Sequence, residues 1–256
     1  MQLSDKITIV TGAASGIGRA TAETFAELGA VVWLADRDTA GGEAAAETIR
    51  SLGGRAHFHP LDVTDYAEAT ALIESVRGEH GRLDVLANVA GWDVVQPFLD
   101  NPPELWEQIV AVNLLGPVRV SRAAVPLLAE SSGGSSGGSS GGSIVNVASD
   151  AGRVGSSGET MYAGAKGGVI AFSKSLAREV VKLGIRVNCV CPGPTDTPLL
   201  ATLPDNLRAA LTKAIPMRRL AVPSEIADAI AFFASDRSAY CTGQVLSVSG
   251  CLTMAG

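Results

Sequence analysis

Tyr162 and Lys166 stand four positions apart, and Ser149 precedes them in the chain. Residues i and i+4 lie on the same face of a helix, so a helix over 160–182 would place the Lys166 ammonium beside the Tyr162 phenol. A nearby positive charge lowers a tyrosine pKa, which begins near ~10. The pair could then exchange a proton with a substrate hydroxyl, as general acid/base chemistry requires. Such i,i+4 pairs are common in ordinary helices, so this interpretation depends on the other motifs.

A glycine-rich turn, Gly12-Ala-Ala-Ser-Gly16-Ile-Gly18, follows a predicted strand at 6–11 and precedes a predicted helix at 17–28. This order presents backbone N–H groups and the positive end of a helix to a pyrophosphate. The spacing is G-x3-G-x-G, so the usual dinucleotide fingerprint G-x-G-x-x-G is not matched literally. The turn predicts a phosphate site formed by Gly12, Ser15, Gly16, Ile17 and Gly18.

An acidic residue, Asp36, ends the second predicted strand at 30–35. A carboxylate at this place accepts hydrogen bonds from the adenosine ribose and repels a 2′-phosphate, which favours NAD over NADP. Arg37 follows it, and a guanidinium could reach a 2′-phosphate. We expect NAD to be preferred, with Asp36 and Arg37 both at the adenosine end of the site.

Together these residues resemble the short-chain dehydrogenase/reductase family, and the resemblance runs from Thr11 to the C-terminus. The motif TGxxxGxG corresponds to Thr11–Gly18. The other matching positions, in chain order, are Asp62-Val63, Asn88-Val-Ala90-Gly91, Asn113, Ser149, Tyr162 with Lys166, and Pro192-Gly193-Pro-Thr195-Asp-Thr197. Val89 stands where the family pattern has a second asparagine, at a position that varies among members.

The resemblance implies a catalytic set of Asn113, Ser149, Tyr162 and Lys166. Tyr162 would exchange the proton, Lys166 would also bind the nicotinamide ribose, Ser149 would hold the substrate oxygen, and Asn113 would hold a relay water. It also implies cofactor contacts beyond the glycine turn, namely Asp62, Val63, Asn88, Ala90, Gly91, Tyr162, Lys166, Pro192, Gly193, Thr195 and Thr197.

Apolar strands alternate with longer helical stretches throughout the chain, with strands predicted near 6–11, 30–35, 55–61, 84–89, 143–148, 185–191 and 243–248. The longest helices are predicted at 103–129 and 160–182. This alternation predicts an α/β fold with a parallel sheet covered on both faces. The resemblance implies a single Rossmann-type, doubly wound domain over 1–256, with strand order 3-2-1-4-5-6-7. Ligands then lie beyond the carboxyl ends of the strands.

Length and composition, 256 residues with 46% hydrophobic content, suit one α/β domain. A formal net charge of −6 argues against binding to nucleic acid or anionic membranes. We found neither a signal peptide nor an apolar run of spanning length, and therefore expect a soluble, cytoplasmic protein. The four cysteines and three histidines match no metal spacing, so we expect free thiols, structural histidines and no metal site.

A low-complexity Ser/Gly repeat occupies 131–143, where family members cross in a few residues. Such a composition predicts a flexible coil, whether it is an engineered linker or a product of repeat slippage. Because it precedes a strand, it should lie at the end of the sheet opposite the active site. We expect it to be catalytically silent.

The substrate site is predicted to involve Trp92, Ser149, Met161 and Leu199, with an apolar lid over 197–222. Arg208, Lys213, Arg218 and Arg219 are interspersed in this lid. They form either a solvated or intersubunit face or a site for the phosphates of a CoA or carrier-protein thioester.

Several pocket segments resemble those of the 2-hydroxycyclohexanecarboxyl-CoA dehydrogenases, although Cys251 replaces a glycine usual near the end. A cyclic 2-hydroxyacyl-CoA is therefore the first substrate expectation. A 3-oxoacyl-thioester reductase comes second, and a dehydrogenase of simple cyclic or secondary alcohols third. An NAD-binding sensor or scaffold is the non-enzymatic alternative, which the intact catalytic set disfavours. The family also implies a homotetramer.

Overall fold

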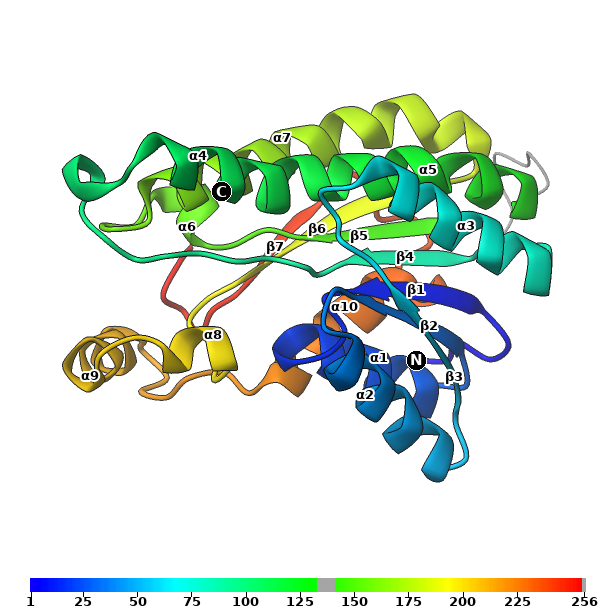
Figure 1. The fold of residues 1–256 in the computed structure, drawn as a ribbon, viewed down its shortest axis with the longest axis horizontal. Helices are drawn as coiled ribbons and strands as arrows, with labels where there is room; N and C mark the ends of the chain where they lie inside the picture. Colours follow the sequence, from blue (N-terminus) through cyan, green and yellow to red (C-terminus); the bar gives the residue numbers. More distant parts are fainter. Residues whose placement is uncertain (133–140, 255–256) are drawn as a thin grey trace.

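A seven-stranded parallel sheet in the order β3-β2-β1-β4-β5-β6-β7 forms the centre of the molecule (Figure 1). The computed structural model describes residues 1–132 and 141–254. The strands are β1 (Ile7–Thr11), β2 (Val31–Asp36), β3 (Arg55–Pro60), β4 (Val85–Asn88), β5 (Ser143–Val147), β6 (Arg186–Pro192) and β7 (Val245–Val248). The doubly wound Rossmann-type fold and the strand order predicted from the sequence are confirmed.

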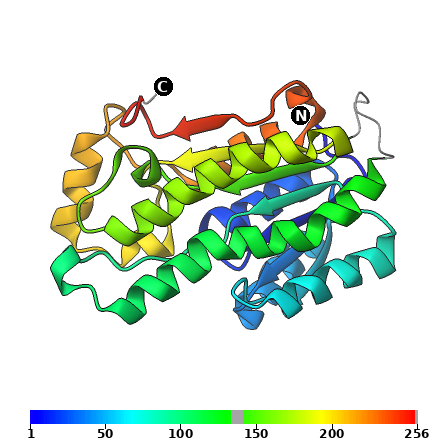
Figure 2. The ribbon, with the colours of Figure 1, turned by 90° about the horizontal axis from the view of Figure 1, so that it is seen from above.

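Helices cover both faces of this sheet, with α3, α4, α5 and α7 on one side and α1, α2 and α10 on the other (Figure 1). Figure 2 shows α5 and α7 running along the sheet beside one another. The helices are α1 (Gly16–Glu27), α2 (Thr39–Ser51), α3 (Tyr66–His80), α4 (Pro103–Val110), α5 (Gly116–Ser131), α6 (Ala151–Val154), α7 (Thr160–Val180), α8 (Pro198–Ala201), α9 (Asp205–Ala214) and α10 (Pro223–Ala234).

The central strands are apolar on both sides because helices cover both faces. Val32 and Leu34 of β2 face the α1/α2/α10 layer, whereas Val31 and Trp33 face the opposite layer. This alternation follows from the two-residue period of a strand. The buried runs that predicted strands in the sequence therefore reflect two hydrophobic cores, one on each side of the sheet.

The long helix predicted at 103–129 consists of α4, a π-helical turn η2 (Ala111–Leu115) and α5. Its stretch Pro103–Ser131 is long and apolar enough to pass a test for membrane spans, with a mean hydropathy of 1.2. A core helix passes the same test, and Val120, Ala124, Leu127 and Leu128 of α5 are buried in the core. Packing against the sheet accounts for these buried side chains of α5.

The two ends of the Ser/Gly repeat belong to ordered elements. Ser131 ends α5, and its hydroxyl accepts a hydrogen bond from the Leu83 backbone N–H at 2.9 Å. Ser143 begins β5 and donates to the Phe233 carbonyl. The predicted flexible coil over 131–143 is therefore wrong at these ends, because each serine has a specific partner, and its central part, 133–140, lies outside the described residues. The repeat enters the sheet at the amino end of β5.

Candidate active site

The glycine turn after β1 is shaped by close backbone approaches. Gly12 has φ +69°, and a β-carbon placed on it would lie 2.7 Å from the Ala90 α-carbon. A β-carbon on Gly18 would lie 2.0 Å from the Gly12 carbonyl oxygen. Any side chain at either position would separate the turn from the segment after β4 or from the start of α1. The glycines thus set the turn tightly against its neighbours, as the motif predicts.

The amino end of α1 points into the cavity that this turn borders. Ser15 is the N-cap residue, and its side chain makes no capping hydrogen bond. The first turn also contains no acidic residue. The N–H groups at this end are therefore free to bind an anion, with the helix dipole in support. This is the donor set that a dinucleotide pyrophosphate needs, so the residues present fit that group.

The carboxyl ends of β2 and β3 supply an acidic rim. Asp36 ends β2, and its carboxylate accepts hydrogen bonds from the N–H groups of Ala14 and Asp38, each at 2.9 Å. Asp62 accepts from the backbone and hydroxyl of Thr64, and the backbone bond is the main cause that lowers the pKa of Asp62. Asp62 is thus held by its own loop, and Asp36 by its own loop and by the glycine turn after β1.

The segment after β4 is anchored to the end of β1. The N–H groups of Val89 and Ala90 both donate to the Thr11 hydroxyl, at 3.0 and 3.1 Å. Asn88 is buried below this point and donates to the Asn146 side chain in β5 and to the Ser121 hydroxyl in α5. Ala90 and Gly91 line the cavity, whereas Asn88 ties the sheet to the helix layer beneath it.

Asn113 lies in the π-helical turn η2 and is fully buried. Its amide donates to the carbonyls of Trp92 and Ile109, at 2.6 and 3.0 Å, and its oxygen accepts from the Trp92 N–H at 3.1 Å. A π-turn inserts one extra residue into a helix, and such turns are frequent at functional sites. Here it turns Asn113 toward the strand ends and fixes the backbone of Trp92.

The Tyr162 and Lys166 pair lies in the first two turns of α7. Lys166 is 2% exposed, its ammonium donates to the Val147 carbonyl at 2.9 Å, and its Nζ lies 5.6 Å from the centre of the Tyr162 ring. Burial lowers the pKa of Lys166 to about 8. Ser149, in the loop two residues beyond the end of β5, accepts a hydrogen bond from the Ala151 N–H and lines the same cavity.

The direction of the Tyr162 shift differs from the sequence expectation. Burial, followed by the charge of Glu159, raises the pKa of Tyr162, and Asp93 acts in the same direction. A hydrogen bond from Ser149 opposes these effects. The argument from Lys166 alone omitted burial, which is the largest cause, and the charges of two carboxyls: Glu159, the N-cap residue of α7, and Asp93 from the loop after β4.

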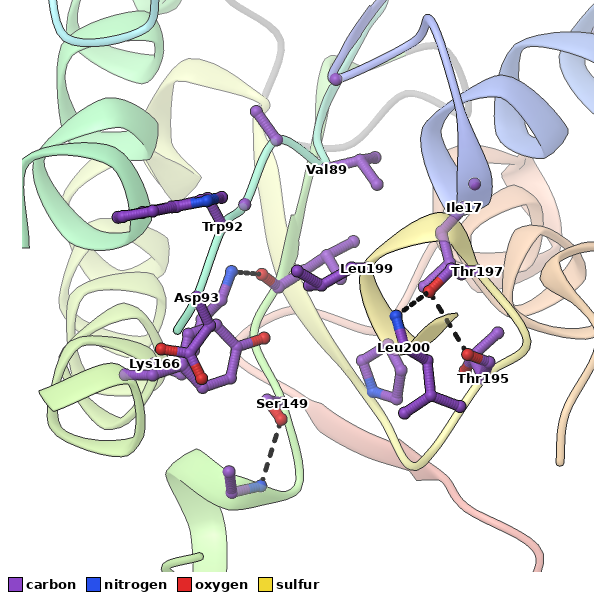
Figure 3. A pocket seen from close by; sticks show the side chains of 18 of the residues that line it. Ile17, Val89, Trp92, Asp93, Ser149, Lys166, Thr195, Thr197, Leu199 and Leu200 are labelled. Carbon is purple, nitrogen blue, oxygen red and sulfur yellow. Dashed lines mark hydrogen bonds between the residues drawn. The ribbon is translucent and has the colours of Figure 1, made fainter. Parts of the chain in front are cut away.

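The turn after β6 crosses to the opposite wall of the cavity. Thr197 caps α8 by accepting from the Leu200 N–H, and Thr195 donates to the Gly193 carbonyl. Figure 3 shows Thr195, Thr197 and Leu200 on one side, facing the wall that holds Ser149, Lys166 and Asp93. The helices α8 and α9 continue this wall as the lid, and they contribute apolar side chains to it: Leu199, Leu200, Leu203, Leu207 and Leu211.

These walls enclose a cavity of about 1140 Å³ beyond the carboxyl ends of the strands. Most of the residues predicted from the sequence line it: Gly12, Ser15, Gly16, Ile17, Gly18, Asp36, Arg37, Asp62, Val63, Ala90, Gly91, Trp92, Ser149, Tyr162, Lys166, Pro192, Gly193, Thr195, Thr197 and Leu199. Three predicted residues do not line it, namely Asn88, Asn113 and Met161. Asn88 and Asn113 contact the segments that form its wall.

Four acidic residues outside the predicted set, Asp38, Asp93, Asp150 and Glu159, also line the cavity, and two of them, Asp93 and Glu159, raise the pKa of Tyr162. Asp93 and Glu159 belong to two segments, Trp92-Asp93 and 150–159, that the sequence predicts to govern substrate choice, but the sequence assigns neither carboxyl a role. Their approach depends on the contact between the loop after β4 and the loop before α7, where the Gln96 N–H donates to the Gly158 carbonyl at 2.9 Å. The position of Asp93 directly after the Asn88–Gly91 turn is the sequence signal that could have identified it.

Two of the histidines pack away from the cavity. The His57 ring stacks on Trp33 with centroids 4.8 Å apart, and the His80 ring meets both edge-on. Together with Glu79, these two histidines place three potential metal-ligating atoms within 4.8 Å of one another. Burial lowers the pKa of His80. This packing supports the structural role predicted for these histidines.

Comparisons with known proteins agree with this geometry. A family model described as enoyl-(acyl carrier protein) reductase matches residues 12–253. The 3-oxoacyl-[acyl-carrier-protein] reductase FabG of Escherichia coli (strain K12) is 40% identical over 99% of this chain and 100% of its own length. The cis-4-hydroxycyclohexanecarboxylate dehydrogenase of Sinomonas cyclohexanicum is 39% identical, over 96% of each chain.

Among solved structures, the crystal structure of gox2181 superposes with a TM-score of 0.92 and 30% sequence identity, covering 98% of this chain and 96% of that one. The family match extends over nearly the whole chain and includes all the walls of the cavity. The chain therefore belongs to the short-chain dehydrogenase/reductase family and is an oxidoreductase that acts on CH–OH groups.

Proposed function

We propose that this enzyme is an NAD-dependent dehydrogenase that interconverts a cyclic secondary alcohol and its ketone, and that any carboxyl group of the substrate is masked as a thioester or ester. The observation that carries the cofactor assignment is the fixed carboxylate of Asp36 at the end of β2. Because both of its oxygens are held by backbone N–H groups, the carboxylate cannot easily turn away from a ribose in the cavity.

The surroundings of Asp36 support NAD over NADP. Asp38 and Asp62 also line this end of the cavity, and Arg37 is the only basic residue lining the cavity besides Lys166 within the part of the chain that the structure describes. A 2′-phosphate would meet three carboxylates against one guanidinium, and like charges at this distance are costly. Arg37 alone does not offset that repulsion.

The catalytic roles follow from the side chains around Tyr162. NAD, when bound, accepts or supplies the hydride. Tyr162 exchanges a proton with the substrate oxygen, and Ser149 holds that oxygen by a hydrogen bond. The charge of Lys166 opposes the effect of burial on the pKa of the Tyr162 phenol. A β-carbon placed on Gly91 would lie 3.2 Å from Lys166 Nζ and 3.1 Å from Asn113 Oδ1, so these two side chains approach the same glycine. Within the described part of the chain Asn113 Oδ1 accepts one hydrogen bond, so it can accept a second one from a relay water.

The wall of the cavity opposite the cofactor combines apolar and acidic side chains, which restricts the class of substrate. Leucines of the lid face a wall with three carboxyls, Asp93, Asp150 and Glu159. A free carboxylate on the substrate would be repelled there, whereas an apolar ring with a masked acid fits both surfaces. The basic residues Arg208, Lys213, Arg218 and Arg219 do not line the cavity, and Arg219 is paired with Glu225. They are available only outside the cavity, to a phosphate-bearing tail that leaves it.

A 3-oxoacyl-thioester reductase is the second candidate. It is favoured by the 40% identity to the FabG protein of Escherichia coli, which is as high as the identity to the cyclohexanecarboxylate enzyme. Both candidates share a ketone beside a masked acid. They differ in whether the apolar part is a ring or a linear chain.

A screen at 340 nm tests the proposal, with NAD and NADP offered beside cyclic alcohols, 2- and 3-hydroxyacyl-CoAs, sugars and steroids. We expect oxidation of cyclic substrates with NAD. Asp36→Asn should lower the ratio of kcat/KM for NAD over NADP by about 10–100-fold, because it removes the charge that repels the 2′-phosphate. Arg37→Gln is the matched control and should raise the ratio. Activity with NADP alone would refute the assignment.

We also propose a cytoplasmic homotetramer, as the family resemblance implies. Exposed apolar side chains are present on the edge strand β7, at Leu246, and nearby at Tyr240 and Met254. A second copy could cover this edge. Light scattering should give four times the chain mass of 26.2 kDa, and a monomer mass would overturn this part of the proposal.

A further inference from the structure

Asp93 is a buried carboxyl group with no fixed partner. It follows the Asn88–Gly91 turn, is 9% exposed, and lines the cavity beside Lys166 (Figure 3). Neither of its oxygens has a hydrogen-bond partner of good geometry among the described residues. Leaving a buried polar group unsatisfied is costly, and leaving a buried charge unsatisfied costs more. Such a group in a ligand cavity is explained if the ligand supplies the missing partner.

The charged and titratable groups that face Asp93 come from two elements. Glu159, from the loop before α7, is the like charge that acts on it most strongly, and Lys166 of α7 acts in the opposite direction. Tyr162 of α7 lies close enough for Asp93 to affect it. Burial and Glu159 together raise the pKa of Asp93 to about 7. Two adjacent carboxyls cannot both ionise cheaply, so Asp93 keeps its proton at weakly acidic pH, below about 7.

The backbone holds this pair in place. The Gln96 N–H donates to the Gly158 carbonyl at 2.9 Å, and a β-carbon on Gly158 would lie 3.1 Å from Val95 Cγ1. Asn113 fixes Trp92, the residue before Asp93, through both its N–H and its carbonyl. The position of Asp93 in the cavity is therefore set by contacts on both sides of it in the chain.

A protonated carboxyl offers one donor, which an ionised carboxylate lacks. Ser149 and Tyr162 already serve the reacting oxygen in the proposed function, so a donor from Asp93 is available for a different atom. A carbonyl oxygen is the complementary acceptor. In a cyclic 2-oxo or 2-hydroxy substrate with a masked acid, the carbonyl carbon of the ester or thioester lies two bonds from the reacting carbon.

We infer that Asp93, protonated and backed by Glu159, donates a hydrogen bond to the ester or thioester carbonyl beside the reacting carbon, and so selects β-oxo and β-hydroxy acyl compounds over simple cyclic ketones and alcohols. This inference rests on the proposed function and names the group that marks its substrate. Asp93 is in this role a specificity-determining residue, and Tyr162 keeps the proton transfer.

The test compares two ketones, ethyl 2-oxocyclohexanecarboxylate and cyclohexanone, each reduced with NADH at pH 6.5. The measured quantity is the ratio of kcat/KM for the oxo-ester over the plain ketone, which is independent of the active fraction of a variant. Asp93→Ala should lower this ratio by about 10–100-fold, because the ester carbonyl would then be buried without its hydrogen-bond donor. Asp93→Asn keeps a donor and should hold the ratio within about fivefold of the wild type.

Two further variants separate a hydrogen bond from the general charge of the wall. Asp150→Ala also removes a cavity-lining carboxyl, one that accepts from the Ser247 hydroxyl at 2.6 Å, and should leave the ratio within about threefold. Glu159→Gln should lower the ratio at pH 8 more than at pH 6, because Asp93 then ionises more readily. In Asp93→Asn the ratio should be independent of pH over this range.

The possible failures are distinguishable. Reduction of both ketones with a ratio that is equal in wild type and Asp93→Ala would overturn the inference alone. An equal loss in Asp93→Ala and Asp150→Ala would also overturn it, because it would show a general charge effect. If the wild type reduces neither ketone with NADH, the proposed function is refuted and the inference falls with it.

Discussion

The two halves of the cavity are built in different ways. The cofactor half is formed by backbone: the glycine turn, the amino end of α1 and the strand ends held together through Thr11. The substrate half is formed by side chains from three separate segments, 92–96, 155–159 and the lid. A backbone site binds the constant part of a cofactor, whereas a side-chain site can change its ligand without changing the fold.

Tyr162 lies between the two halves of the cavity. Removing its hydroxyl should therefore separate an effect on turnover from an effect on NAD binding. Tyr162→Phe should lower kcat by about 10²–10⁴-fold, because it removes the acid/base group and keeps the ring. The affinity for NAD should change by less than about threefold, as measured by calorimetry. Tyr66→Phe, at the exposed start of α3, is the control for loss of a tyrosine hydroxyl. An equal loss of turnover and NAD affinity would place Tyr162 in the cofactor half.

A side chain that disrupts the backbone contacts of the cofactor half should lower both stability and NAD affinity. Gly12→Ala forces φ +69° on a residue with a side chain and brings a β-carbon to 2.7 Å from the Ala90 α-carbon. We expect a loss of about 2–4 kcal/mol in the free energy of unfolding, measured in urea, together with weaker NAD binding. In Gly78→Ala the new β-carbon meets nothing within 4 Å, and this helical change should raise stability by about 0.5–1 kcal/mol. Unchanged stability in Gly12→Ala would show that the turn relaxes freely.

The difference between a backbone-built cofactor half and a side-chain-built substrate half also determines which parts of the site could be predicted from the sequence. Glycine spacing and strand ends are local patterns, so the fold and most of the cofactor half followed from them. Cys251, noted as a departure from a glycine, has φ +72° in the structure, which explains why glycine suits that position. Sequence reasoning placed Asn88 in the site, although its amide bonds to Ser121 and Asn146 beneath the cavity wall.

The substrate half was less predictable because its residues meet only through long-range contacts. Asp93 and Glu159 are 66 positions apart in the numbering and come together through the contact of Gln96 with Gly158. Burial is the main reason why the pKa of Tyr162 moves opposite to the expected direction, and the charges of these two carboxyls add to it. The i,i+4 rule describes Lys166 beside Tyr162 but carries no information on burial or on a carboxyl such as Asp93, which comes from another loop.

The buried carboxyl of Asp93 in the substrate half should make the free energy of unfolding depend on pH. The pKa of Asp93 is raised from 3.8 to about 7 in the folded protein, so the folded state binds more protons than the unfolded state between these values. The contribution of Asp93 to stability is therefore fully present below pH 4 and is lost as pH rises through about 7.

The variant Asp93→Asn tests this pH dependence, because its side chain cannot ionise. Relative to the wild type, its free energy of unfolding should rise between pH 4 and 7.5 by about 1–3 kcal/mol and stay level above. Urea denaturation at pH 5, 6, 7 and 8 measures this difference, with Asp65→Asn, at the exposed cap of α3, as the control. A difference between variant and wild type that does not change with pH would mean that Asp93 ionises freely, as a solvated carboxyl does, and that the substrate half carries no stored electrostatic cost.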